Sequence, residues 1–161
     1  MTRSRKVAAL VVLPATAIAM TAGAAYFKYE SETASASRAA GTEAVAAAGE
    51  TIAAMLTYTP DTVEQTLTAA QLRLTGSFHD EYTQLMHDEV IPEARQRQVR
   101  TVASIPALGV IHAESDKVLV LAYVNQHAAA GAEPPTDTAT TVRATLEKVD
   151  GRWLISGFEP I

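Results

Sequence analysis

The residues whose types could support catalysis or metal binding are the four histidines, two of which directly precede an aspartate. His79-Asp80 and His87-Asp88 would act as general-base pairs only if each carboxylate oriented its neighbouring ring. Adjacent residues on a helix point about 100° apart, so we expect neither aspartate to do this. Residues 79 and 87 lie two helical turns apart, too far to share a metal ion. The pattern therefore predicts surface histidines on a charged helix.

The other two histidines, His112 and His127, lie near the ends of predicted strands. Polar Asn125 and Gln126 precede His127 directly after the most apolar run of the chain, so Tyr123 and His127 are candidate residues of a pocket at the mouth of a sheet. The alternative is that these polar side chains satisfy backbone groups at a sheet edge.

Two classes of chemistry are excluded or unsupported by the residues present. The chain has no cysteine, which excludes disulfides, thiolate metal sites and cysteine nucleophiles. The sequence has no Ser-His-Asp pattern, glycine-rich phosphate loop or spaced set of metal ligands. It therefore predicts a protein that is not an enzyme and holds no cofactor or metal.

Composition and charge limit the size of the fold and its partners. The chain has 161 residues, 48% of them hydrophobic, which suits one compact domain with an appendage. Residues 1–27 carry three bases and no acid, which leaves ten bases against 18 acids, a net charge of −8, in the remainder. Nucleic acid requires a basic surface, so no nucleic-acid partner is expected.

A stretch without charge over residues 7–27 predicts a transmembrane helix. As a helix it would be about 32 Å long, close to the thickness of the hydrocarbon core. Arg3, Arg5 and Lys6 precede it, so the positive-inside rule predicts a cytoplasmic stub at residues 1–6. We expect a single-pass protein of the inner (plasma) membrane, in contact with the lipid bilayer through this helix, with its C-terminal domain outside the cytoplasm.

The competing interpretation of this segment is a cleaved signal peptide with Ala22-Gly23-Ala24 as its cleavage site. It also places the remaining chain outside the cytoplasm. Within the uncharged stretch, Ala15, Ala19 and Gly23 are spaced four apart, which could let a partner helix pack closely.

The elements that would position these residues change from helices to strands along the chain. Residues 28–57 are predicted as a helical stalk or first helix, with Ala48, Ile52 and Met55 on one face. A capping box at Asp61 and Glu64 would open a second helix over 61–74. A third would begin at Ser77 and run past Val90, where Pro92 should kink it or end it early.

The second half predicts about four strands. An extended segment over 99–114 is broken around Pro106 and Gly109, and the apolar run 118–124 suits a strand buried on both faces. A loop over 127–139 leads to an alternating strand at 140–149. Asp150-Gly151 predicts a tight turn into a closing strand over 152–158, in which Trp153 is a core residue with one partner for its Nε1–H.

Three helices followed by a meander of strands predict an α+β fold, with helices on one face of a curved antiparallel sheet. The α+β domain would span residues 58–161.

Three stretches resemble the actinobacterial Mce-associated membrane proteins: "LRLTGSFHDEY" (72–82), "VLVLAYVNQ" (118–126) and "LEKVDGRWLISGFEP" (146–160). Their order and spacing fit across roughly residues 40–161. The resemblance implies an outer domain of the nuclear-transport-factor-2-like (NTF2-like, cone-shaped) or VirB8-like type. It also implies Mce transporter subunits as partners and a role as an accessory subunit that stabilises or assembles a lipid or sterol import complex.

The motif residues carried over are a helix junction, the end of the central strand and the closing hairpin. They are Leu74, Thr75, Gly76, Phe78, Tyr82, Asn125, Gln126, Gly151, Arg152, Trp153 and Pro160. The alternative is an anchored domain that binds a small apolar ligand such as a lipid, or a SnoaL-like enzyme, with its pocket near Tyr123 or His127. Enzymes of this broad fold use a pocket histidine with an acid, and the sequence places no such pair convincingly.

Overall fold

A computed structural model of the chain describes residues 34–161. The compact unit begins at Arg38, within the segment that the sequence assigned to a helical stalk, and runs to Ile161. The predicted stub, the transmembrane or signal segment and the stripe of Ala15, Ala19 and Gly23 lie outside the described residues. In the described part of the chain, no helix is both long enough and apolar enough to cross a membrane.

The first helix covers residues 34–56 and buries an alanine-rich face. Ala44, Ala48 and Ile52 are fully buried and Met55 nearly so, which confirms the predicted face. These side chains are small, so the helix lies close to the sheet: a Cβ added at Gly41 would come within 3.3 Å of Val110. The alanines therefore set how near helix and sheet approach.

The second helix, α2 (Val63–Gln71), begins without the predicted capping box. Its N-cap is Thr62, which makes no side-chain capping bond. Glu64 instead pairs with Arg95 of a later helix, Nη2 to Oε2 2.6 Å. The prediction was wrong because the helix begins at Val63, which puts Glu64 at the second helical position and not at the third, where a capping box requires it.

The third helical segment is continuous but changes its pitch before the proline. It consists of α3 (Gly76–Leu85), a π-helical turn η1 (Met86–Val90) and α4 (Ile91–Gln96). The Ile91 N–H bonds to the Met86 carbonyl, five residues back. Pro92 lacks an N–H and its ring would crowd the carbonyl four residues earlier, so the wide turn admits it without ending the helix.

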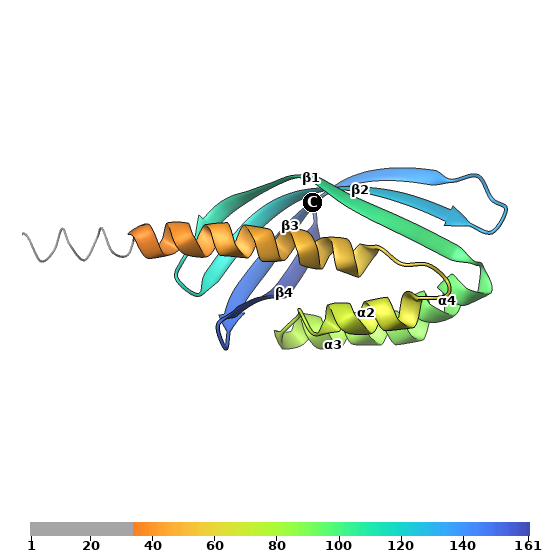
Figure 1. The fold of residues 1–161 in the computed structure, drawn as a ribbon, viewed down its shortest axis with the longest axis horizontal. Helices are drawn as coiled ribbons and strands as arrows, with labels where there is room; N and C mark the ends of the chain where they lie inside the picture. The colour runs from red at the N-terminus through yellow and green to blue at the C-terminus, as the bar shows by residue number, and fades with distance from the viewer. Residues whose placement is uncertain (1–33) are drawn as a thin grey trace, which may run out of the picture. The chain divides into compact units, whose positions relative to one another are not determined.

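The sheet is an antiparallel meander of four strands in the order β1-β2-β3-β4. The strands are β1 (Val99–Ala113), β2 (Lys117–Ala130), β3 (Thr136–Val149) and β4 (Arg152–Pro160). Figure 1 shows the described helices on one side of this sheet. The α+β prediction with helices on one face is confirmed.

Two of the predicted strand boundaries were wrong. Strand β1 is unbroken: Gly109 pairs with Leu121, and Pro106 falls in an irregularity of the ladder between Ser104 and Ala107, where an edge strand tolerates it. The predicted loop over 127–139 is mostly strand, because β2 and β3 continue pairing to Ala128 and Thr136.

The apolar run 118–124 is buried on one face, not on both. Val118, Val120, Ala122 and Val124 are buried, whereas Leu121 and Tyr123 are 38% and 43% exposed. Buried and exposed side chains alternate along this strand although all of its residues are apolar, because the described helices cover only one face of the sheet.

The closing hairpin forms as predicted. Asp150 and Gly151 both have positive φ, 49° and 77°, and connect β3 to β4. Trp153 is 8% exposed, and its Nε1–H donates to Glu43 of the first helix at 3.1 Å. The hairpin is thus fastened to the helix that packs under the sheet.

Candidate functional site

The helix-junction and closing-hairpin motifs meet in space. The Thr75 N–H donates to the Ile155 carbonyl at 2.9 Å, and the Ile155 N–H donates to the Arg73 carbonyl at 3.0 Å. Phe78 stacks on Phe158 with ring centroids 6.1 Å apart. These contacts tie the junction before α3 to β4 and serve the fold itself.

The other motif residues are placed as follows. Leu74 is buried, and Gly76 takes a φ of +64° at the start of α3. Tyr82 is buried, and its hydroxyl lies 3.5 Å from the Met55 carbonyl that it donates to. Burial raises the pKa of Tyr82, with a smaller contribution from Tyr58. Arg152 is exposed opposite Val149, and Pro160, the last residue of β4, pairs with Val142 in the middle of β3.

The strand end implied at Asn125 and Gln126 is not observed. Both residues lie inside β2, which continues for four residues after Gln126. Together with Ser104 and His127 they line an open groove of about 490 Å³ near the β2–β3 end of the sheet. Tyr123 lies on the uncovered face of the same strand and does not line this groove.

Contrary to the sequence-based expectation, three of the four histidines contact an acid. His112 Nε2 lies 3.2 Å from Glu114 Oε1, and the other two contacts are shorter. The register of β2 and β3 places His127 opposite Asp137, with Nδ1 and Oδ1 2.7 Å apart. His79 Nδ1 lies 2.9 Å from Asp80 Oδ1, although the residues are adjacent.

These pairs are largely exposed, and His127 and Asp137 both line the open groove of about 490 Å³. The side chains of His127 and Asp137 are 56% and 84% exposed, and Asp80 is equally open. A general base needs a site that holds the substrate against it. Within residues 34–161 no three His, Asp or Glu side chains gather closely enough to hold a metal ion.

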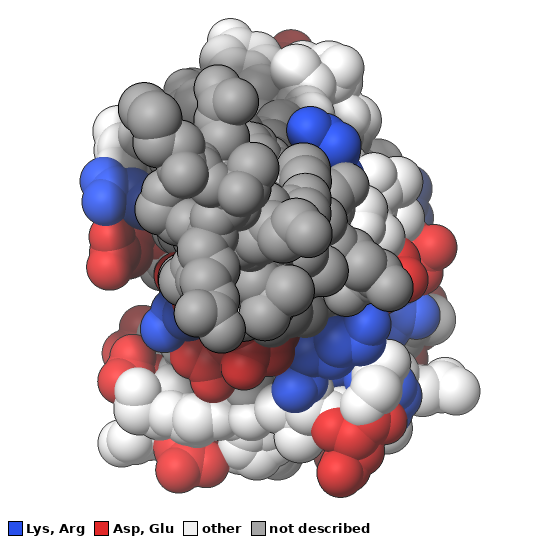
Figure 2. Space-filling view, turned by 90° about the vertical axis from the view of Figure 1, so that its left-hand side faces the viewer, with Lys and Arg blue, Asp and Glu red and all other residues white. Residues whose placement is uncertain are grey.

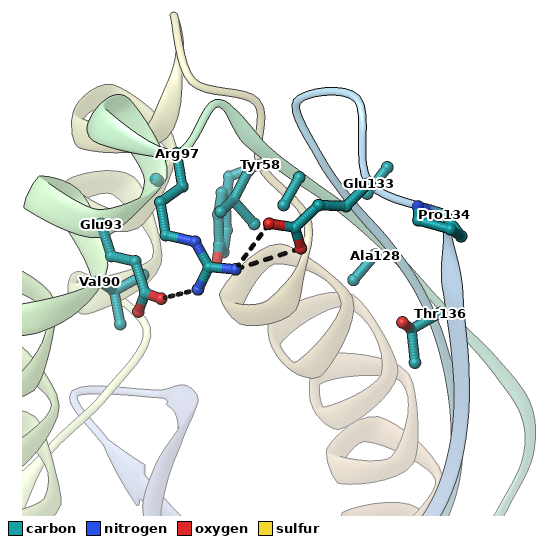
Figure 3. Close-up of a pocket in the computed structure, with 12 residues that line it drawn as sticks. Tyr58, Val90, Glu93, Arg97, Ala128, Glu133, Pro134 and Thr136 are labelled. Atoms are coloured by element: carbon teal, nitrogen blue, oxygen red, sulfur yellow. Dashed lines mark hydrogen bonds and ion pairs between the residues drawn. The ribbon is translucent and has the colours of Figure 1, made fainter.

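A second hollow, of about 250 Å³, lies between α4 and the end of the β2–β3 hairpin (Figure 3). We call it the α4–hairpin hollow. Val90, Glu93, Ala94 and Arg97 face it from one side of the helix, at the spacing of i, i+3, i+4 and i+7. Its opposite wall combines small apolar residues with residues of the hairpin end, namely Val99, Ala128, Ala129 and Ala130 with Glu133, Pro134 and Thr136.

Tyr58 forms the inner wall of the hollow. Its backbone makes two hydrogen bonds with Thr101 of β1, at 3.0 and 2.9 Å, which fix the loop after the first helix. Burial raises the pKa of the Tyr58 hydroxyl, and the negative charge of Glu93 raises it further. The ring is therefore held in place beside a negative charge.

Arg97 bridges two carboxylates at the rim of the hollow. Its Nη1 donates to Glu93 Oε1 at 2.7 Å, and its Nη2 approaches Glu133 Oε2 at 3.3 Å (Figure 3). The hydrogen bond to Glu93, then the charge of Glu133, raise the pKa of Arg97. The i, i+4 pair of Glu93 and Arg97 could have been found in the sequence, but its meeting with Glu133 depends on the hairpin.

The opposite end of the domain carries the β1–β2 and β3–β4 turns. Its acidic and basic side chains form ion pairs with one another. Lys148 Nζ lies 2.8 Å from Glu43 Oε2, and Lys117 Nζ lies 3.3 Å from Glu147 Oε1. Figure 2 shows acidic and basic side chains beside one another on this end. Here the opposite charges are paired with one another.

Three helical segments on one face of a four-stranded antiparallel meander give the chain a VirB8-like fold. The chain superimposes on an IcmL-like type IV secretion system protein of Legionella pneumophila with a TM-score of 0.62, at 11% identity over 73% of this chain and 90% of that one. On the VirB8 protein of Agrobacterium tumefaciens the TM-score is 0.58, at 12% identity over 72% and 88%. At these identities the likeness concerns the fold alone.

The sequence comparison places the chain in a family. Over 156 residues it is 44% identical to the outer membrane protein Rv1973 of Mycobacterium tuberculosis (strain ATCC 25618 / H37Rv), covering 97% of this chain and 98% of that protein. No family model matches the chain. The chain belongs to the family of Rv1973 and is a cell-envelope protein homologous to it.

Proposed function

We propose that this protein is a non-catalytic accessory subunit that stabilises or assembles an Mce-type lipid or sterol import complex in the cell envelope. The observation that carries the proposal is the filled interior of the fold. Ala44, Ala48 and Ile52 of the first helix are fully buried, as are Val120 and Leu146 of the sheet. A cone that enclosed a lipid or a substrate would need room on this face of the sheet.

Two further observations support a role in assembly. The described His–acid pairs are largely exposed, and the groove that His127 and Asp137 line is open, so these pairs lack the enclosure that catalysis uses. The VirB8-like fold also occurs in a protein described as a type IV secretion system component. The Mce partners themselves are proposed from the three sequence stretches that resemble the Mce-associated proteins.

We propose that the protein lies in the inner membrane, with residues 7–27 as its single span and the folded domain outside the cytoplasm. The name of the homologue Rv1973 assigns that protein to the outer membrane. Separation of inner from outer envelope fractions, followed by detection of a C-terminal tag, distinguishes the two locations. Recovery with the outer fraction would contradict the proposed span.

The test of function is co-purification of the full-length chain, tagged at its C-terminus, from a native host in mild detergent. We expect Mce transporter subunits in stoichiometric amounts, and their loss on Gly23→Leu in the proposed partner stripe. Ala25→Leu is the matched control, because two residues along a helix the side chain faces the other way. A protein recovered alone, or with a lipid visible by native mass spectrometry, would favour the ligand-binding alternative.

A further inference from the structure

We propose that the α4–hairpin hollow receives a basic side chain, arginine or lysine, presented by a segment of a partner protein. This inference rests on the proposed role in assembly and names the chemistry that one contact of that assembly would use. It is carried by the shape of the hollow, by its charges and by the fixed position of its walls.

The hollow has room for one long side chain. At about 250 Å³ it is too small for a helix, whose diameter with side chains is about 10–12 Å. Its walls of alanine and valine suit the aliphatic stem of a lysine or arginine, which buries its methylene groups while its charged end stays at the rim.

The charge at the rim favours a cation. Two carboxylates, Glu93 and Glu133, face one guanidinium, Arg97, so the charged side chains that line the hollow sum to −1. The raised pKa of Tyr58 reflects in part the negative charge of Glu93 at the inner wall. An anionic side chain would meet two like charges, and an uncharged one would leave the surplus carboxylate unused.

Glu133 is the carboxylate that remains available. Its two oxygens lie 3.3 and 3.5 Å from Arg97 Nη2, whereas Glu93 holds Nη1 at 2.7 Å. The side chain of Glu133 is 65% exposed, so it can accept a further donor without losing Arg97. An incoming ammonium or guanidinium would therefore bind at Glu133.

The walls are held before any partner arrives. The Gly131 N–H donates to the Gln98 carbonyl at 3.3 Å, which fastens the hairpin end to the segment after α4. Gly131 and Gln98 both have positive φ, 53° and 54°, and set the path of the two chains. A preformed hollow lowers the ordering cost of binding.

The rest of the domain attracts basic segments. Residues 34–161 hold nine bases and 16 acids, a net charge of −7. Such a field raises the rate at which a basic partner arrives, and salt weakens it.

The test uses the full-length chain in detergent micelles with ¹³C-labelled alanine methyl groups. Three capped tripeptides are titrated: Gly-Arg-Gly, Gly-Glu-Gly and Gly-Leu-Gly. We expect saturable shifts with the arginine peptide at the methyls of Ala94, Ala128, Ala129 and Ala130, which line the hollow. The methyl of Ala139 in the other groove is the internal control.

Two variants isolate the carboxylate. Glu133→Gln should weaken binding of the arginine peptide about two- to fivefold, the range of a single exposed ion pair. Glu64→Gln is the matched control, since Glu64 also pairs with an arginine of α4, Arg95, yet does not line the hollow. Absence of saturable shifts, equal binding of the glutamate or leucine peptide, or equal loss in both variants would overturn the inference.

This result is separable from the proposed function. A chain that binds the arginine peptide at the hollow but purifies without Mce subunits keeps the inference and loses the lipid-import role. A chain that purifies with those subunits but fails the titration loses the inference alone.

Discussion

Enlarging Ala48 in the first helix tests whether the interior of the fold is filled. Ala48 is fully buried against the sheet, among side chains that are themselves buried. In a close-packed interior, Ala48→Leu forces neighbouring side chains to move and should lower the free energy of unfolding by about 1–3 kcal/mol.

A ligand cavity at this position would give the opposite sign. Leucine adds three carbons to alanine, and each buried methylene stabilises by about 0.8 kcal/mol, so filling a void should raise the free energy of unfolding by about 2 kcal/mol. The sign of the change therefore separates the accessory-subunit proposal from the ligand-binding alternative.

The assay is urea unfolding of the full-length chain in detergent, followed by the fluorescence of Trp153. The indole of Trp153 is buried and hydrogen-bonded to Glu43, which lies on the same helix as Ala48, so unfolding exposes the indole to water. Ala46→Leu is the matched control, because Ala46 is exposed on the other side of the helix and should change stability by less than about 0.5 kcal/mol. An Ala48→Leu protein more stable than the parent would refute the filled interior.

Three further predictions concern local features. Gly151→Ala should destabilise the protein by about 1–2 kcal/mol in urea unfolding, because φ at this position is +77°. Gly49→Ala should stabilise it by about 0.5–1 kcal/mol, because Gly49 lies inside a helix and an added Cβ would meet nothing within 4 Å. Equal effects of the two substitutions would contradict the backbone argument. The hydrogen bond from Lys148, then that from Trp153, lower the pKa of Glu43 from 4.5, so its contribution to stability is complete above that pH and is lost as pH falls through the lower folded-state value. A pH series of unfolding midpoints should show this loss in the parent and not in Glu43→Gln. A double-mutant cycle of Phe78→Leu and Phe158→Leu should give a coupling of about 0.5–1.5 kcal/mol, and additive effects would mean that the stacked rings contribute no specific contact.

The overall fold could be predicted because its signals are local. Asp150 and Gly151 specify a tight turn by their tolerance of positive φ, whatever surrounds them. Ala48, Ile52 and Met55 recur at the helical period, so one face of the first helix had to be buried. Element order then limits the fold to helices against an antiparallel meander, and the homology to Rv1973 agrees with an envelope protein.

Errors arose where a neighbour decides between two local possibilities. Residues 118–124 are apolar throughout, and only the placement of the helices determines that Leu121 and Tyr123 face outward. Asp61 and Glu64 satisfy a capping pattern, yet the helix begins at Val63 with Thr62 as its N-cap, and Glu64 pairs with Arg95. Pro92 follows a π-helical turn that admits its ring without ending the helix, and the residue type alone does not indicate such a turn.

The sequence by itself determined the order of helices and strands, the buried face of the first helix, the closing turn and the absence of cysteine chemistry, because each depends on residue type and short-range spacing. Tertiary structure alone decided which distant residues meet. Strand register brings His127 to Asp137, and the β2–β3 hairpin brings Glu133 to Arg97 across 36 positions of the chain. Such long-range contacts depend on how the whole chain packs, and the spacing of residues along the sequence does not specify that packing.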